Sequence, residues 1–254
     1  MISNSPKIKI IAHRGGVVDP HRSENSFAAL EEAIRRGYTH VEIDARITGD
    51  GHVVCFHNDE LLEEAGIQGK ISKMPLREVV KITLTRSGEK IPTFEEYCAH
   101  CAGRIAVMID LKGCNTKHIP TYTHEIEGAL RTHNLLDDAL ILINKIPVNN
   151  QETISQHFFG LSKVSWRHSL PTTQNAAQQN PTLSKHYYVF NHFQDFTQEN
   201  LVSYQSLGFE VIVSINTHHY KNGSPQPQGE HNVRQVLEWG ANGLQIDSCY
   251  DIVL

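Results

Sequence analysis

Seven polar residues lie at or just after the ends of segments that have the composition of β-strands. They are three carboxylates, two imidazoles, one guanidinium and one amine: Glu42, Asp44, Asp110, His13, His57, Arg14 and Lys112. Three carboxylates that share a cleft repel one another and are costly to desolvate without a cation. Oxygen ligands of this kind suit Mg²⁺ or Ca²⁺, and arginine and lysine beside such a cation suit a phosphate. Two histidines can act as acid and base near neutral pH, so the set predicts metal-assisted phosphoester chemistry.

The spacing of these residues supports a shared site. Glu42 and Asp44 are two residues apart in a strand-like segment, so their side chains lie on the same side of it, and Asp110 and Lys112 repeat that spacing. Each residue alone also has a structural interpretation, such as a salt bridge for either carboxylate or a helix cap for His13. The convergence of all seven at strand ends favours a functional site.

Short β-branched segments alternate with helical patterns along the chain. The strand-like segments are Ile8–Ala12, His40–Ala45, Val53–Phe56, Ile105–Asp110, Ala139–Ile143, Leu161–Ser165, Tyr187–Phe190, Glu210–Ser214 and Gly243–Ile246. Between them, Phe27, Leu30 and Ile34 have helical spacing and are followed by Gly37 as a C-cap. Residues Asn232–Trp239, ended by Gly240, repeat that arrangement.

Strands of this kind, alternating with helices, predict an α/β protein with a parallel sheet covered by helices. The segment Thr48-Gly-Asp-Gly51 is too short for a helix, so Val53–Phe56 is expected to return as an antiparallel arm. The other eight strands are the number that closes a (β/α)8 TIM barrel. We therefore expect one barrel domain over residues 1–254, in which polar residues at the carboxyl ends of strands face the site.

The composition of the chain limits the classes of molecule that it is expected to bind. The chain has 254 residues and a formal charge of −5, which argues against broad electrostatic binding to nucleic acid or to an anionic membrane. Its apolar segments are too short for a transmembrane helix, and Met1–Lys7 lacks the pattern of a signal peptide. Five scattered cysteines fit a reducing cytoplasm. We expect a protein without stable membrane insertion; the oligomeric state has no sequence signal.

Two local features have alternative interpretations. Cys98-Ala-His-Cys101 could be a zinc or redox motif, but two cysteines on one face of a helix are favoured because no second pair answers them. Asn222–Gly229 is the clearest loop and follows the seventh barrel strand, so it could be a lid or a solvated crossing. We treat His218, His219 and His231 as solvated background.

The sequence resembles the glycerophosphodiester phosphodiesterases. The resemblance rests on Ile11-Ala-His-Arg-Gly15, Ser23-Glu-Asn-Ser26, Val41-Glu-Ile-Asp44 with Thr48-Gly-Asp-Gly51, His52-Val-Val-Cys-Phe-His57 and Ile91-Pro-Thr-Phe-Glu-Glu96. These motifs keep the family's order over residues 8–112. A weaker match is Gly240-Ala-Asn-Gly-Leu-Gln-Ile-Asp247, and residues 115–230 match only in their strand–helix rhythm.

The resemblance implies a TIM barrel of the phospholipase C-like phosphodiesterase type. It also implies a short insertion at about residues 58–91, after the second barrel strand. The implied activity is the hydrolysis of small glycerophosphodiesters to sn-glycerol 3-phosphate and an alcohol with a divalent cation, Mg²⁺ or Ca²⁺.

Carried over by position, each of the seven residues receives a role. His13 and His57 resemble the acid–base pair, and Arg14 resembles the phosphate-binding arginine. The metal-ligand positions fall on three carboxylates, Glu42, Asp44 and Asp110. Lys112 matches the lysine two residues after the third of these ligands.

Two departures from the family pattern touch the expected site. Asp110 stands where the family has Glu, so its carboxylate is set back by about 1.5 Å, and a cation must move or a water must bridge. Asn58 stands where the family has Asp after the second histidine. A neutral amide at that position lowers the basicity of His57, unless Asp59 takes over.

Two further departures lie beside the motifs. Ser23 replaces a proline, and the family's aromatic residue is missing near Ser214-Ile-Asn216, which could alter the pocket wall and thus the substrate.

Two other functions stay open. The same layout occurs in lysophospholipase D or sphingomyelinase D-like lipid phosphodiesterases, although the sequence has no basic amphipathic helix for membrane docking. The departures at Asp110 and Asn58 also allow a barrel that binds a phosphorylated ligand without turning it over. Which alcohol group is preferred, Mg²⁺ versus Ca²⁺, and direct attack by water versus a cyclic intermediate are not decided by sequence.

Overall fold

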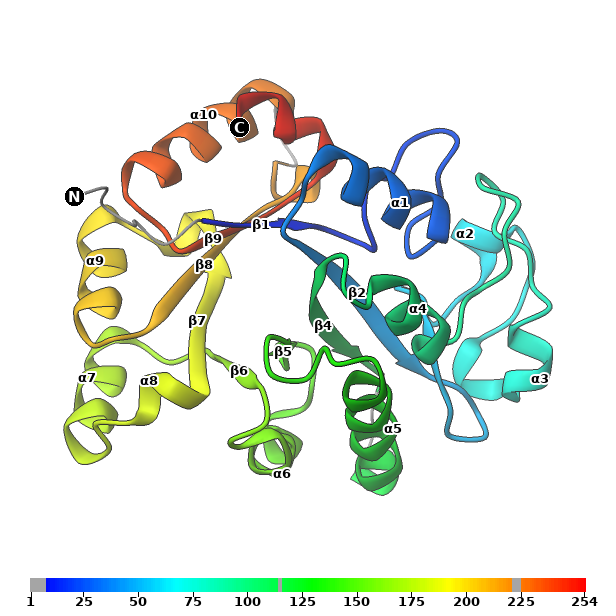
Figure 1. Cartoon of the computed structure of the whole chain (residues 1–254), viewed down its shortest axis with the longest axis horizontal. Helices are drawn as coiled ribbons and strands as arrows, with labels where there is room; N and C mark the ends of the chain where they lie inside the picture. The colour runs from blue at the N-terminus through cyan, green and yellow to red at the C-terminus, as the bar shows by residue number, and fades with distance from the viewer. Residues whose placement is uncertain (1–7, 114–115, 221–224) are drawn as a thin grey trace. The chain divides into compact units, whose positions relative to one another are not determined.

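The computed structural model describes residues 8–113, 116–220 and 225–254 (Figure 1). Contacts between residues divide the chain into two compact units, Ala12–Val164 and a second unit of Met1–Ile11 with Ser165–Leu254. All seven residues of the expected site lie in the first unit.

Nine strands alternate with helices over the described residues. The strands are β1 (Lys9–Ala12), β2 (His40–Ile47), β3 (Val53–Cys55), β4 (Ala106–Lys112), β5 (Leu140–Leu142), β6 (Lys163–Trp166), β7 (Tyr187–His192), β8 (Glu210–Ile215) and β9 (Gly243–Ile246). Every segment that the sequence marks as a strand is present, with bounds that differ by at most two residues. Eight of these strands are those of a (β/α)8 TIM barrel, and β3 is the additional arm, so the predicted fold class is confirmed.

Ten α-helices fill the connections of the described chain. They are α1 (Phe27–Arg36), α2 (Leu62–Ala65), α3 (Leu76–Val79), α4 (Phe94–Cys101), α5 (Ile119–Thr132), α6 (Val148–Phe158), α7 (Leu170–Gln179), α8 (Leu183–His186), α9 (Gln198–Ser206) and α10 (Pro225–Glu238). Short 3₁₀ turns η1 to η5 cover Ile71–Lys73, Thr116–His118, Phe193–Asp195, Thr217–His219 and Ser248–Val253. Gly37 caps α1 in the left-handed conformation at φ 83°, as its position after the apolar stripe predicts.

Strand β2 organises the sheet of the unit Ala12–Val164. All eight of its residues are buried, and it pairs in parallel with β4 over seven residues, with Asp44 opposite Asp110. On its other edge β3 runs antiparallel, with Ala45 opposite Cys55, as the turn at residues 48–51 predicts. The register therefore places polar residues from two neighbouring strands at one level of the sheet.

The segment between β3 and α4 is an insertion with a small core of its own. It contains α2, η1 and α3, and its apolar side chains form one buried cluster with the end of the arm: Val54, Phe56, Leu61, Ala65, Ile71, Val79, Ile82, Leu84 and Ile91. Backbone hydrogen bonds hold the insertion to its surroundings, including Cys55 N–H to Pro92 O at 3.0 Å and Gly49 N–H to Met74 O at 2.8 Å. The predicted short insertion after the second barrel strand is thus confirmed, and its own core fixes its position beside the arm.

In the second unit, β7, β8 and β9 pair in parallel. A buried hydrogen-bond network lies within this sheet, in which Ser214 Oγ donates to Gln245 Oε1 at 2.8 Å and Asn216 Nδ2 donates to Ser214 Oγ at 2.9 Å. Polar groups therefore occupy the place where the sequence comparison notes a missing aromatic residue.

The prediction of a loop over Asn222–Gly229 is wrong from Pro225 onward. Residues 222–224 lie outside the described part of the chain, but α10 already begins at Pro225. Proline is tolerated in the first turn of a helix because the N–H groups there have no intrahelical partner. The two prolines that indicate a loop in the sequence instead open a helix.

Cys98 and Cys101 both lie on the buried side of α4, which confirms the interpretation as one helix face. Burial raises the pKa of the Cys98 thiol and raises that of Cys101 to about 12. Both thiols are therefore protonated and behave as small apolar groups. No helix in the described ranges combines the length and the apolarity that a membrane crossing requires.

Since the chain divides into two compact units, a single domain over residues 1–254 stays a prediction.

Candidate active site

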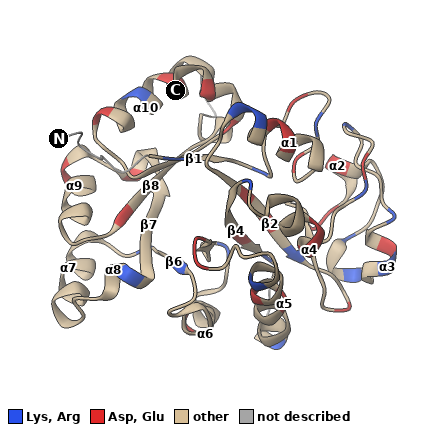
Figure 2. Cartoon of the chain, viewed as in Figure 1, with Lys and Arg blue, Asp and Glu red and all other residues tan. Residues whose placement is uncertain are grey.

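Three carboxylates from two neighbouring strands form a buried cluster. Glu42 and Asp44 come from β2 and Asp110 from β4, and one oxygen of each lies within 4.8 Å of the others. Their exposed fractions are 1%, 1% and 7%. Figure 2 marks the charged residues, with both signs on α1 and no charged residue on α7. The parallel register that sets Asp44 opposite Asp110 builds this cluster.

Lys112 supplies a positive charge inside the cluster. Its ammonium lies 3.1 Å from Asp44 Oδ1 and donates a hydrogen bond to Asp110 Oδ2. Burial lowers the pKa of Lys112, but the three carboxylates outweigh that effect and raise it overall. The lysine is therefore charged, and one ammonium faces three carboxylates.

The carboxylates respond differently to this shortage of positive charge. Burial acts to raise the pKa of Asp44, but Lys112, His57 and the Asn25 amide hold it below its ordinary value. Burial and the charge of Asp44 raise the pKa of Glu42 well above its usual range, and burial together with Asp44 also raises that of Asp110. The cluster is thus electrostatically strained at neutral pH.

The residues present fit a divalent cation. Asp110 Oδ1 is buried and has no hydrogen-bond partner in the described structure, and the partner of the buried Asp44 Oδ1 is the Lys112 ammonium. Two oxygens that share one cation at about 2.1–2.6 Å can be up to about 5 Å apart, so separations of no more than 4.8 Å are compatible with a common ion. The shorter side chain of Asp110 therefore reaches the cluster.

Arg14 is held by its backbone and by its side chain. Its φ of 54° is left-handed, and its N–H donates to Glu42 Oε2 at 2.7 Å. The next residue, Gly15, has φ 78°, and a Cβ there would lie 2.5 Å from Asn25 Cα, so only glycine fits. The guanidinium donates to Glu24 Oε2 at 2.6 Å. Burial raises the pKa of Glu24 to about 7 although Arg14 opposes the shift.

Asn25 is a site residue that the sequence analysis does not assign. Its Nδ2 donates to Asp44 Oδ2 at 2.8 Å and its Oδ1 accepts the N–H of Asp44 at 3.1 Å, so the amide fixes both the side chain and the backbone of Asp44. The motif Ser23-Glu-Asn-Ser26, which precedes α1, contains Asn25 and is the sequence signal that could have identified it. Motif and carboxylate are 19 residues apart, so only the fold shows that they meet.

His57 lies at the end of the arm and is held from two sides. Arg46, on β2, donates to the backbone carbonyls of Phe56 and His57, at 3.3 Å and 3.2 Å from Nε. The ring Nδ1 lies 2.9 Å from Asn58 Oδ1. Burial lowers the pKa of His57 to about 4, against the effect of Asp44. The arm thus brings a neutral imidazole near the carboxylates.

Asp59 does not replace the acid that the family pattern has beside this histidine. Its Oδ1 accepts the N–H of Ser72 at 2.9 Å and its Oδ2 accepts the Ser72 hydroxyl at 2.8 Å. The carboxylate therefore closes the turn of the insertion.

His13 follows the last residue of β1 and is half-buried. When protonated, its imidazole lies near enough to lower the pKa of both Asp44 and Asp110. The structure therefore brings His13 and His57 to the same carboxylate cluster.

Two buried tyrosines brace the backbone below the site, and the sequence analysis does not single them out. Tyr97, on α4, donates to Gly15 O at 2.5 Å. Tyr122, on α5, donates to Ala45 O and accepts the N–H of Lys112 at 3.0 Å. Both helices thereby fix the strand ends that carry the polar residues.

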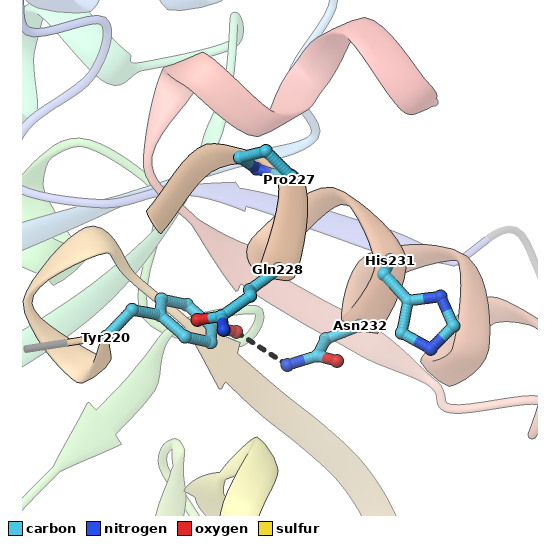
Figure 3. A pocket seen from close by; sticks show the side chains of 5 residues that line it. All are labelled: Tyr220, Pro227, Gln228, His231 and Asn232. Atoms are coloured by element: carbon cyan, nitrogen blue, oxygen red, sulfur yellow. Dashed lines mark hydrogen bonds between the residues drawn. The ribbon is translucent and has the colours of Figure 1, made fainter. Parts of the chain in front are cut away.

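A hollow lies in the other unit (Figure 3). It has a volume of about 440 Å³ and is lined by Tyr220, Pro227, Gln228, His231 and Asn232. Asn232 Nδ2 donates to the Tyr220 hydroxyl at 2.8 Å, which ties α10 to the segment after β8. Among these lining residues there is one imidazole and no carboxylate, so they offer no acid–base pair.

The comparisons with known proteins agree with this geometry. The model of the glycerophosphoryl diester phosphodiesterase family matches residues 13–178, which begin at His13 and include all seven residues of the expected site. The chain belongs to this family. The C-terminal motif at residues 240–247 lies outside the matched range.

Relatives support the family over part of the chain and the fold over nearly all of it. Human glycerophosphodiester phosphodiesterase 1 is 31% identical over 116 residues, which are 42% of this chain and 34% of the relative. The match thus spans well under half the length of the first curated relatives.

Two solved structures align with the fold at a TM-score of 0.73. A glycerophosphoryl diester phosphodiesterase from Parabacteroides distasonis is 18% identical, and the alignment covers 96% of this chain and 84% of that one. A phosphodiesterase from Oleispira antarctica, in complex with the product sn-glycerol-3-phosphate, is 20% identical, with 95% and 93% covered.

The strained cluster predicts the pH dependence of stability in this family member. Because folding raises the pKa of Glu42, its contribution to stability is present below the ordinary pKa of 4.5 and is lost as the pH rises through the raised value. In EDTA we expect Glu42→Gln to be more stable than the wild type at pH 8 and to lose less stability between pH 5 and pH 8. Urea unfolding at the two pH values measures the difference.

Glu199→Gln, which removes one exposed carboxylate on α9, is the control and should keep the wild-type slope. A divalent cation at 100 times its dissociation constant should stabilise the wild type by about 2.7 kcal/mol and the Glu42 variant by less. Equal slopes for wild type and Glu42→Gln would contradict the description of the cluster.

Proposed function

We propose that the protein is a divalent-cation-dependent phosphodiesterase that hydrolyses glycerophosphodiesters to sn-glycerol 3-phosphate and an alcohol. The observation that carries the proposal is the buried cluster of Glu42, Asp44 and Asp110, which lies beside Arg14 and Lys112 and in which Asp110 Oδ1 has no hydrogen-bond partner. Membership of the family supports it, as does the product named for the Oleispira antarctica structure.

The cationic side chains fit a phosphodiester. Arg14 Nε is buried without a hydrogen-bond partner, while another guanidinium nitrogen donates to Glu24. Arginine can therefore keep its place through Glu24 and still donate to a phosphate oxygen. Lys112 adds a fixed positive charge next to the carboxylates. A bound Mg²⁺ or Ca²⁺ would supply further neutralisation of a nonbridging phosphate oxygen.

The two imidazoles supply the proton transfers in this proposal. One of His13 and His57 takes a proton from the attacking hydroxyl, and the other donates a proton to the leaving oxygen. The hydroxyl belongs either to water or to the glycerol part of the substrate, and the two routes differ in whether a cyclic phosphate forms.

Hydrolysis of glycerophosphocholine and glycerophosphoethanolamine tests the proposal. With glycerol 3-phosphate as the detected product, we expect turnover in Mg²⁺ or Ca²⁺, none in EDTA, and a loss of about 10²- to 10⁴-fold in kcat for His13→Ala and for His57→Ala. The kcat/KM of the wild type should be bell-shaped in pH. A flat profile from pH 5 to 9 would contradict the scheme with two histidines.

The same assay separates the two other functions. Preference for a lysolipid over glycerophosphocholine would indicate a lipid phosphodiesterase of the lysophospholipase D or sphingomyelinase D type. Binding of a cation and phosphate with no turnover of any diester would indicate a binding protein. We favour a small diester in the cytoplasm because no feature of the sequence indicates docking to a membrane.

Asp110 gives a second test of the same site. Its carboxylate is buried, contacts Lys112 and already lies within reach of the other two carboxylates. Lengthening it by one methylene crowds a site that has closed around Asp, since overpacking a buried position costs about 1–3 kcal/mol. We therefore expect Asp110→Glu to lower kcat/KM by about tenfold.

Asp138→Glu, a change at an exposed position, is the control for Asp110→Glu and should have no effect. A large gain in rate for Asp110→Glu would instead show that the aspartate weakens the site.

A further inference from the structure

A chain of hydrogen bonds runs from His57 outward to the surface of the insertion. The ring Nδ1 of His57 lies 2.9 Å from Asn58 Oδ1, and Asn58 Nδ2 donates to Glu63 Oε2 at 2.8 Å. Glu63 is exposed and lies in the first turn of α2. The catalytic roles discussed above do not use Glu63.

The chemistry of these groups fixes the direction of the chain. An ionised carboxylate only accepts hydrogen bonds, so the amino end of the Asn58 amide must face Glu63. The carbonyl end of the same amide then faces His57 and can only accept. A neutral His57 must therefore carry its proton on Nδ1, which leaves the lone pair of Nε2 free.

Other acids of the same segment have different partners. Asp59 accepts two hydrogen bonds from Ser72. Glu60 pairs with Lys70 at 2.8 Å, and both are largely exposed. Glu64 points into the protein, where it is buried and lies 3.7 Å from Arg86. Glu63 is thus the carboxylate of residues 59–64 that engages Asn58.

The insertion holds Glu63 in place. Leu61 and Ala65, on either side of Glu63, are buried in the apolar cluster of the insertion. Leu61 N–H donates to Gly69 O at 3.1 Å, and Ile71 N–H donates to Asp59 O at 2.9 Å. These contacts close the loop around α2 and present its first turn to Asn58.

We propose that Glu63 is a positioning residue that acts through the Asn58 amide to hold His57 as the Nδ1-protonated tautomer, with Nε2 free to accept a proton. The inference rests on the proposed function, because it makes His57 the base of that reaction. In the step, the O–H bond of the attacking hydroxyl breaks and its proton bonds to Nε2, while an electron pair of that oxygen forms the bond to phosphorus. The P–O bond to the leaving group breaks, and the leaving oxygen keeps the electron pair of that bond and takes a proton from His13.

The arrangement also accounts for Asn58. The positive charge that develops on His57 faces an amide oxygen whose amide is polarised by a carboxylate. The family pattern has an acid directly beside this histidine. Here the acid is Glu63, and the Asn58 side chain lies between it and His57.

The test is the tautomer of His57 in the resting, full-length protein. Long-range ¹H–¹⁵N spectra of protein labelled at histidine nitrogens distinguish Nδ1–H from Nε2–H, and the signal missing in His57→Gln identifies the residue. We expect Nδ1–H in the wild type. In Glu63→Ala the amide is free to turn, so the population should shift toward Nε2–H. Glu60→Ala, which removes an exposed acid of the same segment, should leave the spectrum unchanged.

Kinetics test the consequence of the shift. Because the loss of one hydrogen bond has a modest net effect, Glu63→Ala should lower kcat by about threefold to tenfold with KM unchanged. Adding Asn58→Asp to Glu63→Ala should restore kcat, because a carboxylate at position 58 accepts from Nδ1 in either orientation. That rescue is not expected of residues with a merely structural role.

The outcomes separate this inference from the proposed function. A wild-type tautomer in Glu63→Ala overturns the inference, whether or not the wild type hydrolyses diesters. A shifted tautomer in a protein that hydrolyses no diester supports the positioning by Glu63 and overturns the proposed function alone. A shifted tautomer with reduced kcat and rescue by Asn58→Asp supports both.

Discussion

The burial of three carboxylates around one ammonium is the constraint on which the site depends. Glu42, Asp44 and Asp110 cannot all ionise at low cost beside a single Lys112, and the opposite pKa directions of Asp44 and Glu42 express that conflict. A rigid backbone is needed to keep these mutually repelling carboxylates close together. Here β2 is buried along its whole length and pairs with β4 over seven residues.

The surrounding contacts serve to hold the cluster and its cationic neighbours in one geometry. Asn25 grips Asp44 at two atoms, and the main-chain N–H of Arg14 reaches Glu42 from a left-handed conformation. The left-handed backbone conformation of Arg14 is held in place because the next residue, Gly15, packs against Asn25 and accepts a hydrogen bond from Tyr97. Such preorganisation matters for phosphoryl chemistry, in which electrostatic stabilisation of developing charge contributes much of the rate.

Sequence alone predicts the strands well and places the seven polar residues at or just after their ends, because both inferences follow local rules. Apolar runs with β-branched residues mark the strands, and the spacing of Glu42 and Asp44 places them on one side. The opening turn of α10 was missed because prolines at 225 and 227 indicate a loop unless they fall in the first turn. Local patterns also could not identify Arg46 as a hydrogen-bond donor to the His57 carbonyl, since that contact depends on the antiparallel register of β2 and β3.

The departures from the family pattern at Asp110 and Asn58 also show that local sequence patterns miss contacts made by the fold. Read as isolated substitutions, both suggest a weakened site. In the structure, Asp110 reaches the other carboxylates, and Asn58 is joined to Glu63 by an insertion with its own apolar core. Whether a substitution weakens a site depends on what the fold places beside it, and residues 5 to 68 positions away are outside the reach of a local pattern.

Titration calorimetry with Mg²⁺ and with Ca²⁺ tests the central claim most directly, using the wild type and Asp44→Asn at pH 7.5. The account predicts that the wild type binds one of these cations at one site per chain, with protons released from Glu42 or Asp110, and that Asp44→Asn loses the binding. Absence of binding in the wild type, or unchanged binding in Asp44→Asn, would contradict the claim that the buried carboxylates form a cation site.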